Sequence, residues 1–306
     1  MQGLIIRSTG SWYQVQLPDG RRVEARIKGK FRIKGLSTTN PVAVGDVVDI
    51  EFEPGSDNAV INNLHPRRNY IIRKSINLSK QAQIIAANLD QAFLVVTLAS
   101  PRTSLGFIDR FLVTAEAYSI PAALVFNKLD LFSKEGLEIL AEYQDIYRKI
   151  GYPCYEVSAL KGTNIDQITE LITGKTTLFS GHSGVGKSSL INALLPDLDI
   201  RTGEVSDWSD KGMHTTTFAE MHQLPGGGFI VDTPGIRELG VIDIEQAELS
   251  HFFPEMRDRL NQCRFNNCRH VNEPGCAVLE AVEEGEIDIS RYESYLSIYH
   301  GNDTRA

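Results

Sequence analysis

The alternation of hydrophobic and polar residues in the amino-terminal part of the chain predicts short strands separated by tight turns. Apolar and polar side chains alternate along residues 47–52, and the Pro-Asp-Gly tripeptide at residues 18–20 is a strong hairpin signal. Five short strands within 64 residues suit a small Greek-key barrel of the oligonucleotide/oligosaccharide-binding (OB) type. The strands are predicted at residues 3–7, 12–17, 22–27, 47–52 and 60–64.

From residue 84 the pattern changes to apolar strands that alternate with amphipathic helices. Buried strands are predicted at residues 92–98, 122–126 and 154–157, and residues 65–82 are predicted to be a connector. This rhythm predicts a mostly parallel sheet covered by helices on both faces, with a ligand at the carboxyl ends of the strands. Helices are predicted at residues 107–118, 136–150, 165–171, 187–195, 277–286 and 289–299.

Length and composition place the chain among globular proteins of two or three domains. It has 306 residues, of which 42% are hydrophobic and 23% charged. No apolar run approaches the roughly 18 residues that a membrane span needs, and residues 1–7 are too short for a signal peptide. We therefore expect a cytoplasmic protein with no membrane partner. No extended apolar repeat points beyond a monomer.

The net charge of −8 conceals a basic amino-terminal module on an acidic body. Residues 1–80 carry 13 Lys and Arg against 7 Asp and Glu. With Trp12, Tyr13 and Phe31 as stacking faces, this surface is typical of proteins that bind single-stranded or irregular RNA. The alternative is a solvated hairpin whose aromatic residues belong to the core. The candidate RNA contacts are Arg21, Arg22, Arg26, Lys28, Lys30, Arg32 and Lys34.

Residues 181–188, Gly-His-Ser-Gly-Val-Gly-Lys-Ser, match the phosphate-loop pattern G-x-x-x-x-G-K-[ST] at every fixed position. The glycines let the backbone N–H groups point at phosphates, Lys187 adds a positive charge, and the Ser188 hydroxyl can ligate Mg²⁺. The candidate nucleotide contacts in this loop are Gly181, His182, Ser183, Gly184, Val185, Gly186, Lys187, Ser188 and Ser189.

Residues 127–130, Asn-Lys-Leu-Asp, follow a predicted buried strand and indicate that the base is guanine. Asp130 can accept hydrogen bonds from N1–H and from the exocyclic amine of guanine, a donor pair that adenine lacks. Asn127 can bridge the base and the surrounding loops, and the stem of Lys128 can cover the ring. Alone, the motif is weak, because charged turns after strands are common.

Three further motifs occupy strand ends or the loop between them. Ser158-Ala159 follows a strand, where the Ala159 N–H could meet guanine O6. Asp232 and Gly235 form a D-x-x-G motif that can hold the Mg²⁺ shell and sense a γ-phosphate. A switch threonine among Thr215, Thr216 and Thr217, with Thr216 as the candidate, would complete the Mg²⁺ site. Together with the phosphate loop, these signals predict a GTP-binding domain.

Cys263, Cys268, His270 and Cys276 lie within 14 residues near the end of the chain. Three thiolates and an imidazole suit one tetrahedral Zn²⁺ ion, and four protein ligands leave no open position for catalysis. We therefore predict a structural zinc site that replaces a hydrophobic core. Cys154, in a predicted strand, is expected to be a small core residue.

The guanine-nucleotide motifs occur in the order G4-G5-G1-G2-G3. G4 is the Asn-Lys-Leu-Asp motif and G1 the phosphate loop, whereas G5 lies at residues 158–160, G2 among residues 215–217 and G3 at residues 232–235. The GTPase domain is therefore predicted to be circularly permuted. With an OB-type module before it and the Cys/His cluster after it, the chain resembles the ribosome small-subunit-dependent GTPase A family over essentially its whole length. This resemblance implies a GTPase that binds the 30S subunit and 16S rRNA and acts in late subunit maturation, with hydrolysis stimulated by the subunit.

The predicted organisation is a multi-domain chain: an all-β OB-fold barrel, an α/β P-loop GTPase domain with a mostly parallel sheet, and a small, mainly α-helical zinc-binding domain. The boundaries are predicted at residues 1–68, 69–240 and 241–306. The second switch is the segment at the D-x-x-G motif. Because the chain leaves the core soon after Gly235, we expect loss of the γ-phosphate at this switch to reposition the zinc-binding domain.

The catalytic group is the open question, since Ile236 stands where many GTPases place a water-orienting glutamine. His214 and Lys187 are the candidate catalytic residues, and a ribosomal group supplied in trans is the alternative. A second functional hypothesis is an RNA-binding scaffold in which GTP is a slowly hydrolysed structural switch. The motif at residues 127–130 argues against an ATPase or a small-molecule kinase.

Overall fold

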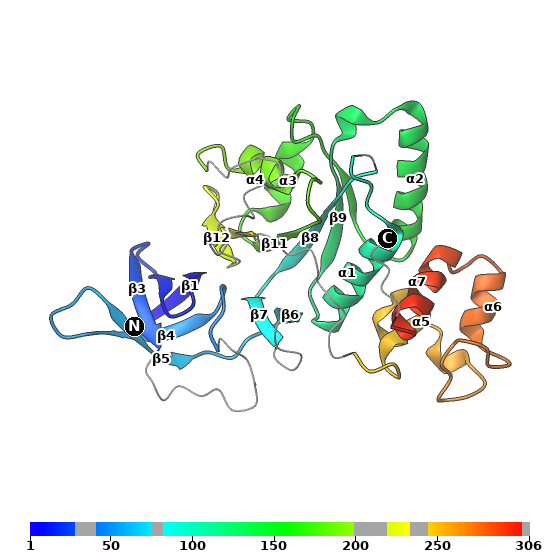
Figure 1. Cartoon of the computed structure of the whole chain (residues 1–306), viewed down its shortest axis with the longest axis horizontal. Helices are drawn as coiled ribbons and strands as arrows, with labels where there is room; N and C mark the ends of the chain where they lie inside the picture. The colour runs from blue at the N-terminus through cyan, green and yellow to red at the C-terminus, as the bar shows by residue number, and fades with distance from the viewer. Residues whose placement is uncertain (28–40, 75–81, 99, 199–218, 233–243, 302–306) are drawn as a thin grey trace, which may run out of the picture.

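The chain folds into three parts that follow one another along the sequence (Figure 1). A β-barrel forms the amino-terminal part, a helix-covered sheet forms the middle, and a group of short helices forms the carboxyl-terminal part. The computed structural model describes residues 1–27, 41–74, 82–98, 100–198, 219–232 and 244–301.

Five strands close the amino-terminal barrel. β1 pairs with both β2 and β4, and the parallel pairing of β3 with β5 completes the ring. The inward-facing positions are apolar, as the period-two pattern predicted, and Ile5, Val15 and Ile61 are fully buried. The strands are β1 (Gln2–Ser8), β2 (Tyr13–Gln16), β3 (Arg22–Ile27), β4 (Val47–Phe52) and β5 (Ala59–Leu64).

The segment predicted as a connector, residues 65–82, instead contains a strand. β6 (Tyr70–Lys74) pairs antiparallel with β7 (Ala82–Ala87) in a separate two-stranded sheet. Ile72 and Ile84 from the two strands pack on Ala43 in a small buried apolar cluster. The predicted connector therefore contains a strand that the sequence did not indicate.

A sheet of six strands forms the middle part, in the order β10-β9-β8-β11-β13-β12. All neighbours are parallel except β12, which runs antiparallel to β13, so the predicted mostly parallel sheet is confirmed. β12 was not predicted. At Arg7 and Glu220, β1 of the barrel pairs with β12, so barrel and sheet are continuous. The strands are β8 (Gln91–Val96), β9 (Ala122–Phe126), β10 (Cys154–Glu156), β11 (Thr176–Ser180), β12 (Glu220–Gln223) and β13 (Phe229–Asp232).

Helices cover both faces of this sheet because its buried strands are apolar on both sides. Leu94 and its alternate neighbours pack with α1 and α2, whereas Phe93 and Val95 pack with α3 and α4. The helices are α1 (Leu105–Ala117), α2 (Lys134–Lys149), α3 (Ile165–Ile172) and α4 (Lys187–Leu194), with a 3₁₀ turn η1 at Leu129–Leu131.

The carboxyl-terminal part is helical, as predicted, and packs against α1 (Figure 1). Val113 of α1 belongs to the same hydrophobic cluster as Phe253 and Tyr295. Among the described helices, none is long and apolar enough to cross a bilayer. The elements are η2 (Leu249–Phe252), α5 (Pro254–Arg257), η3 (Leu260–Gln262), α6 (Ala277–Glu283) and α7 (Ile289–Tyr299).

Candidate functional site

The phosphate-loop sequence forms the turn between β11 and α4. Gly186 has φ of +88°, and a Cβ there would lie 2.4 Å from Nδ2 of Asn127. Gly181 has φ of +151°, and a Cβ there would lie 2.6 Å from the Val95 carbonyl oxygen. Both positions therefore require glycine, because the loop approaches its neighbours too closely for a side chain.

Asn127 joins the base-recognition motifs to the phosphate loop. Its side chain is 1% exposed, its Nδ2 donates to the Val185 carbonyl (2.9 Å), and its Oδ1 accepts from the Ala159 N–H (3.1 Å). One amide thus links its own motif to two others, which lie 32 and 58 residues further along the chain. The Ala159 N–H, expected to meet guanine O6, is directed at Asn127.

Asp130 is held in place by its neighbours. Its carboxylate accepts a hydrogen bond from the Ser158 hydroxyl, which itself accepts from the Lys161 N–H at 3.1 Å. Lys128 adopts a left-handed backbone conformation with φ of 65°, and its Nζ donates to the Ser100 carbonyl at 2.6 Å. The carboxylate that is predicted to bind guanine is therefore oriented by a hydrogen bond from Ser158.

Lys187 and Asp232 form an ion pair beside the phosphate loop. Asp232 ends β13, where it pairs in register with Phe179 of the adjacent strand β11, so it lies next to the start of the loop. Ser188 follows Lys187 in the first turn of α4. A carboxylate and a hydroxyl are the hard oxygen ligands that suit Mg²⁺, so this donor set fits the ion.

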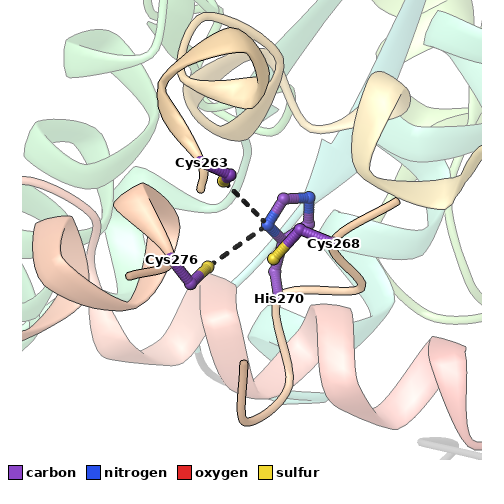
Figure 2. A group of neighbouring side chains, drawn as sticks. All are labelled: Cys263, Cys268, His270 and Cys276. Atoms are coloured by element: carbon purple, nitrogen blue, oxygen red, sulfur yellow. Dashed lines mark hydrogen bonds between the residues drawn. The ribbon is translucent and has the colours of Figure 1, made fainter. Parts of the chain in front are cut away.

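The three cysteines and the histidine of the predicted zinc cluster come together (Figure 2). Their ligand atoms all lie within 4.8 Å of one another, and Nδ1 of His270 is 3.6 Å from Sγ of Cys263 and 3.3 Å from Sγ of Cys276. A tetrahedron with metal–sulfur bonds of about 2.3 Å has edges of about 3.8 Å. The donors and their spacing therefore fit one Zn²⁺ ion bound through Nδ1.

Residues that the sequence did not single out hold this cluster in place. The Glu273 carboxylate accepts hydrogen bonds from three backbone N–H groups, those of Arg269 and Val271, which flank His270, and that of Asn272. Burial alone would raise the pKa of Glu273, but these donors lower it to about 2. The Tyr292 hydroxyl donates to the His270 carbonyl at 2.9 Å. Burial raises the pKa of the Cys268 thiol to about 12, so a metal is needed to favour its thiolate.

Comparison with known proteins decides the family. The family model described as RsgA GTPase matches residues 64–242, and the one described as RsgA N-terminal domain matches residues 2–61. The chain belongs to the RsgA GTPase family. Small ribosomal subunit biogenesis GTPase RsgA from Bacteroides fragilis is 54% identical over 97% of this chain and 96% of its own. The protein of that name from Christiangramia forsetii is 52% identical, over 99% and 97% of the two chains.

Two solved structures share the whole architecture. YjeQ from Thermotoga maritima has a TM-score of 0.79 and 37% identity, covering 100% of this chain and 99% of its own. YloQ, described as a circularly permuted GTPase, has a TM-score of 0.76 and 32% identity, covering 100% and 96%. The predicted fold class, the permuted motif order and the classification as a GTPase are confirmed.

The basic surface of the RsgA N-terminal domain is only partly described. Arg21 pairs with Asp19 at 2.7 Å, and Arg26 pairs with Glu53. Tyr13 is 2% exposed and belongs to the barrel core, so the prediction that it offers a stacking face was wrong. It points inward because alternate residues of β2 line the barrel. Trp12 is 38% exposed and remains available for stacking.

Several predicted site residues fall outside the described residues. They are Lys28, Lys30, Phe31, Arg32, Lys34, His214, Thr216, Gly235 and Ile236.

Proposed function

We propose that this chain hydrolyses GTP to GDP and phosphate and acts in biogenesis of the small ribosomal subunit, which it binds through 16S rRNA. Two relatives that carry this role in their names are 52–54% identical over nearly the full chain. The observation that carries the nucleotide part is the Asn127 side chain, which ties the Asn-Lys-Leu-Asp turn, Ala159 and the phosphate loop together. We further propose that the chain works as a cytoplasmic monomer.

Guanine specificity rests on Asp130. Its carboxylate accepts hydrogen bonds but donates none, so it matches the N1–H and amine donors of guanine. The Ser158 hydroxyl orients it, and Lys128 stands beside it with its ammonium group on the Ser100 carbonyl. Adenine offers no matching donor pair, so we expect ATP to bind poorly.

Phosphate binding and catalysis rest on the loop and on the two strand ends beside it. The backbone N–H groups of residues 181–189 and the Lys187 ammonium group stabilise negative charge on the phosphates. Ser188, Asp232 and Thr216 would hold Mg²⁺, which neutralises the charge that develops during phosphoryl transfer. Because Ile236 cannot orient water, we assign that role to His214.

The other two domains supply binding surfaces. We propose that the barrel, residues 1–68, contacts rRNA through its basic residues, since the ion pairs of Arg21 and Arg26 are exposed and can exchange for phosphate. Residues 69–240 form the GTPase domain. Residues 241–306 form the zinc-binding domain, where the ion would add to the stability that a small apolar core around Phe253 and Tyr295 provides.

Steady-state GTP turnover with and without purified 30S subunits tests the proposal. We expect slow GTP turnover by the protein alone and a faster rate when subunits are added. In a separate competition assay, excess GTP should displace bound GDP, whereas excess ATP should not. A turnover rate that 30S subunits leave unchanged would contradict the ribosomal role. A rate that stays near zero in both conditions would favour the scaffold hypothesis.

A further inference from the structure

The phosphate loop carries a side-chain anchor of its own. His182 lies between two loop glycines, and its Nδ1 is 3.1 Å from the Ser183 carbonyl oxygen. A carbonyl can only accept, so Nδ1 carries the proton in this contact. Nε2 lies at hydrogen-bond distance from the hydroxyl of Thr103, 2.7 Å away.

Thr103 lies in the short segment that leads into α1, two residues before the helix begins at Leu105. Thr103 is 1% exposed, and its Oγ1 also accepts from the Thr97 N–H at 3.1 Å. Phe107, in the first turn of α1, meets the His182 ring edge to face, with ring centroids 5.4 Å apart. A Cβ at Gly184 would lie 3.0 Å from Cδ of Pro101. On one side the loop therefore contacts the segment that leads into α1 and the first turn of that helix. On the other side Asn127 donates a hydrogen bond to it.

The same helix carries the zinc-binding domain on a different face. Asp109, Val113 and Glu116 are spaced by four and three residues, so they lie on one face of α1. Asp109 accepts from Nη1 of Arg291 at 2.7 Å, and Glu116 accepts from Nη1 of Arg257 at 3.0 Å. Between them, Val113 packs in the core of the zinc-binding domain. Figure 1 shows α1 between the sheet and α7.

We propose that His182 is a positioning residue for nucleotide binding, and that docking of the zinc-binding domain on α1 sets the geometry of the phosphate loop through it. Arg291 and Asp109 are 1% and 0% exposed, and packed groups with so little freedom transmit displacement rather than absorb it. This route runs through α1 and is separate from the chain segment that follows Asp232. The proposal concerns the nucleotide site alone and does not depend on the ribosomal role.

Binding of a fluorescent GDP analogue to the full chain tests this coupling. The variants are His182→Ala, Arg291→Met and their combination. We expect each single change to weaken GDP binding by roughly 2- to 30-fold. The double variant should bind GDP as tightly as the single variant with the lower affinity, because both changes act through one contact. Lys149→Ala, which removes an exposed ion pair on α2, is the control and should leave affinity unchanged.

Two further measurements distinguish positioning from loss of fold. His182→Gln keeps an acceptor for Thr103 and a donor for the backbone, so it should bind GDP within about threefold of wild type. His182→Ala should raise KM for GTP with little change in kcat. Where Arg291→Met fails to fold, Arg257→Ala replaces it, with a smaller change expected in the same direction.

Independent effects in the double variant, or unchanged GDP affinity in both zinc-domain variants, would overturn the proposal while leaving the proposed function intact. A wild-type chain that binds no guanine nucleotide would overturn both.

Discussion

Replacing Arg291 by methionine removes the centre of a buried charge network. The guanidinium group donates to Asp109 and to both oxygens of Glu255 at 2.7, 2.7 and 3.3 Å, and it stacks on Phe253 with 4.7 Å to the ring centroid. Methionine fills much of the volume but leaves two buried carboxylates without their cation. Breaking a buried pair in this way costs about 3–5 kcal/mol of stability.

The stability that Arg291→Met loses should depend on pH. Burial raises the pKa of Asp109, against the opposing effect of Arg291, and removal of Arg291 raises it further. An acid whose pKa is raised in the folded state binds more protons in that state than in the unfolded chain. Its contribution to stability therefore falls as the pH rises from the unfolded-state pKa to the folded-state pKa. The variant is therefore least stable, relative to wild type, at neutral pH and recovers part of the deficit in mild acid.

Hydrogen exchange of α1 and α7 amides, followed by mass spectrometry, measures the local opening free energy at pH 7.5 and pH 5.5. Arg257→Ala is the matched control because its ion pair with Glu116 is 47% and 26% exposed, and exposed pairs contribute at most about 1 kcal/mol. An Arg291→Met deficit below about 1 kcal/mol, or one that is equal at both pH values, would refute this reasoning.

Four further changes test the sites. His214→Ala should spare GTP binding and lower 30S-stimulated turnover by about 10²-fold or more, and unchanged stimulated turnover would reject the catalytic assignment. Asp130→Asn should weaken GTP binding and shift preference toward xanthosine triphosphate, measured by competition, since the amide donates where the carboxylate accepts. Cys276→Ser should release zinc, measured with a chromogenic chelator, and destabilise α6 and α7; full zinc retention would contradict the ligand assignment. Glu273→Ala should weaken zinc affinity by about 10- to 100-fold without removing a ligand, whereas equal affinity would show that the loop needs no carboxylate.

Local patterns made much of the fold predictable. The barrel strands and the helix at Ile289–Tyr299 follow from period-two and period-3.6 patterns that neighbouring residues set. The phosphate loop and the zinc cluster are runs of nearby residues, so their spacing carries the information. β12 was missed although the Pro-Gly-Gly-Gly stretch at residues 225–228 is a turn signal between it and β13.

Contacts between distant residues could not be predicted. Asp109, Glu255 and Arg291 are charged residues whose separations of 36 and 182 positions leave no local signal, and charged helical residues are normally exposed. For the same reason the motif at residues 127–130 indicated guanine but not the bridge from Asn127 to Val185. His182 was assigned to the loop as a nucleotide contact, and its partner Thr103 lies 79 residues away.

The pairing of β1 with β12 has a consequence for the solubility of the GTPase sheet. Open strand edges present unpaired backbone groups that recruit strands from other chains. β12 is the outer strand of this sheet, and the barrel meets its edge at Arg7 and Glu220, where an ion pair at 3.8 Å and a side-chain hydrogen bond from Gln16 to Gln223 at 3.0 Å reinforce the contact. The barrel thereby covers the β12 edge of this sheet, one of its two edges, where strands of other chains could otherwise pair.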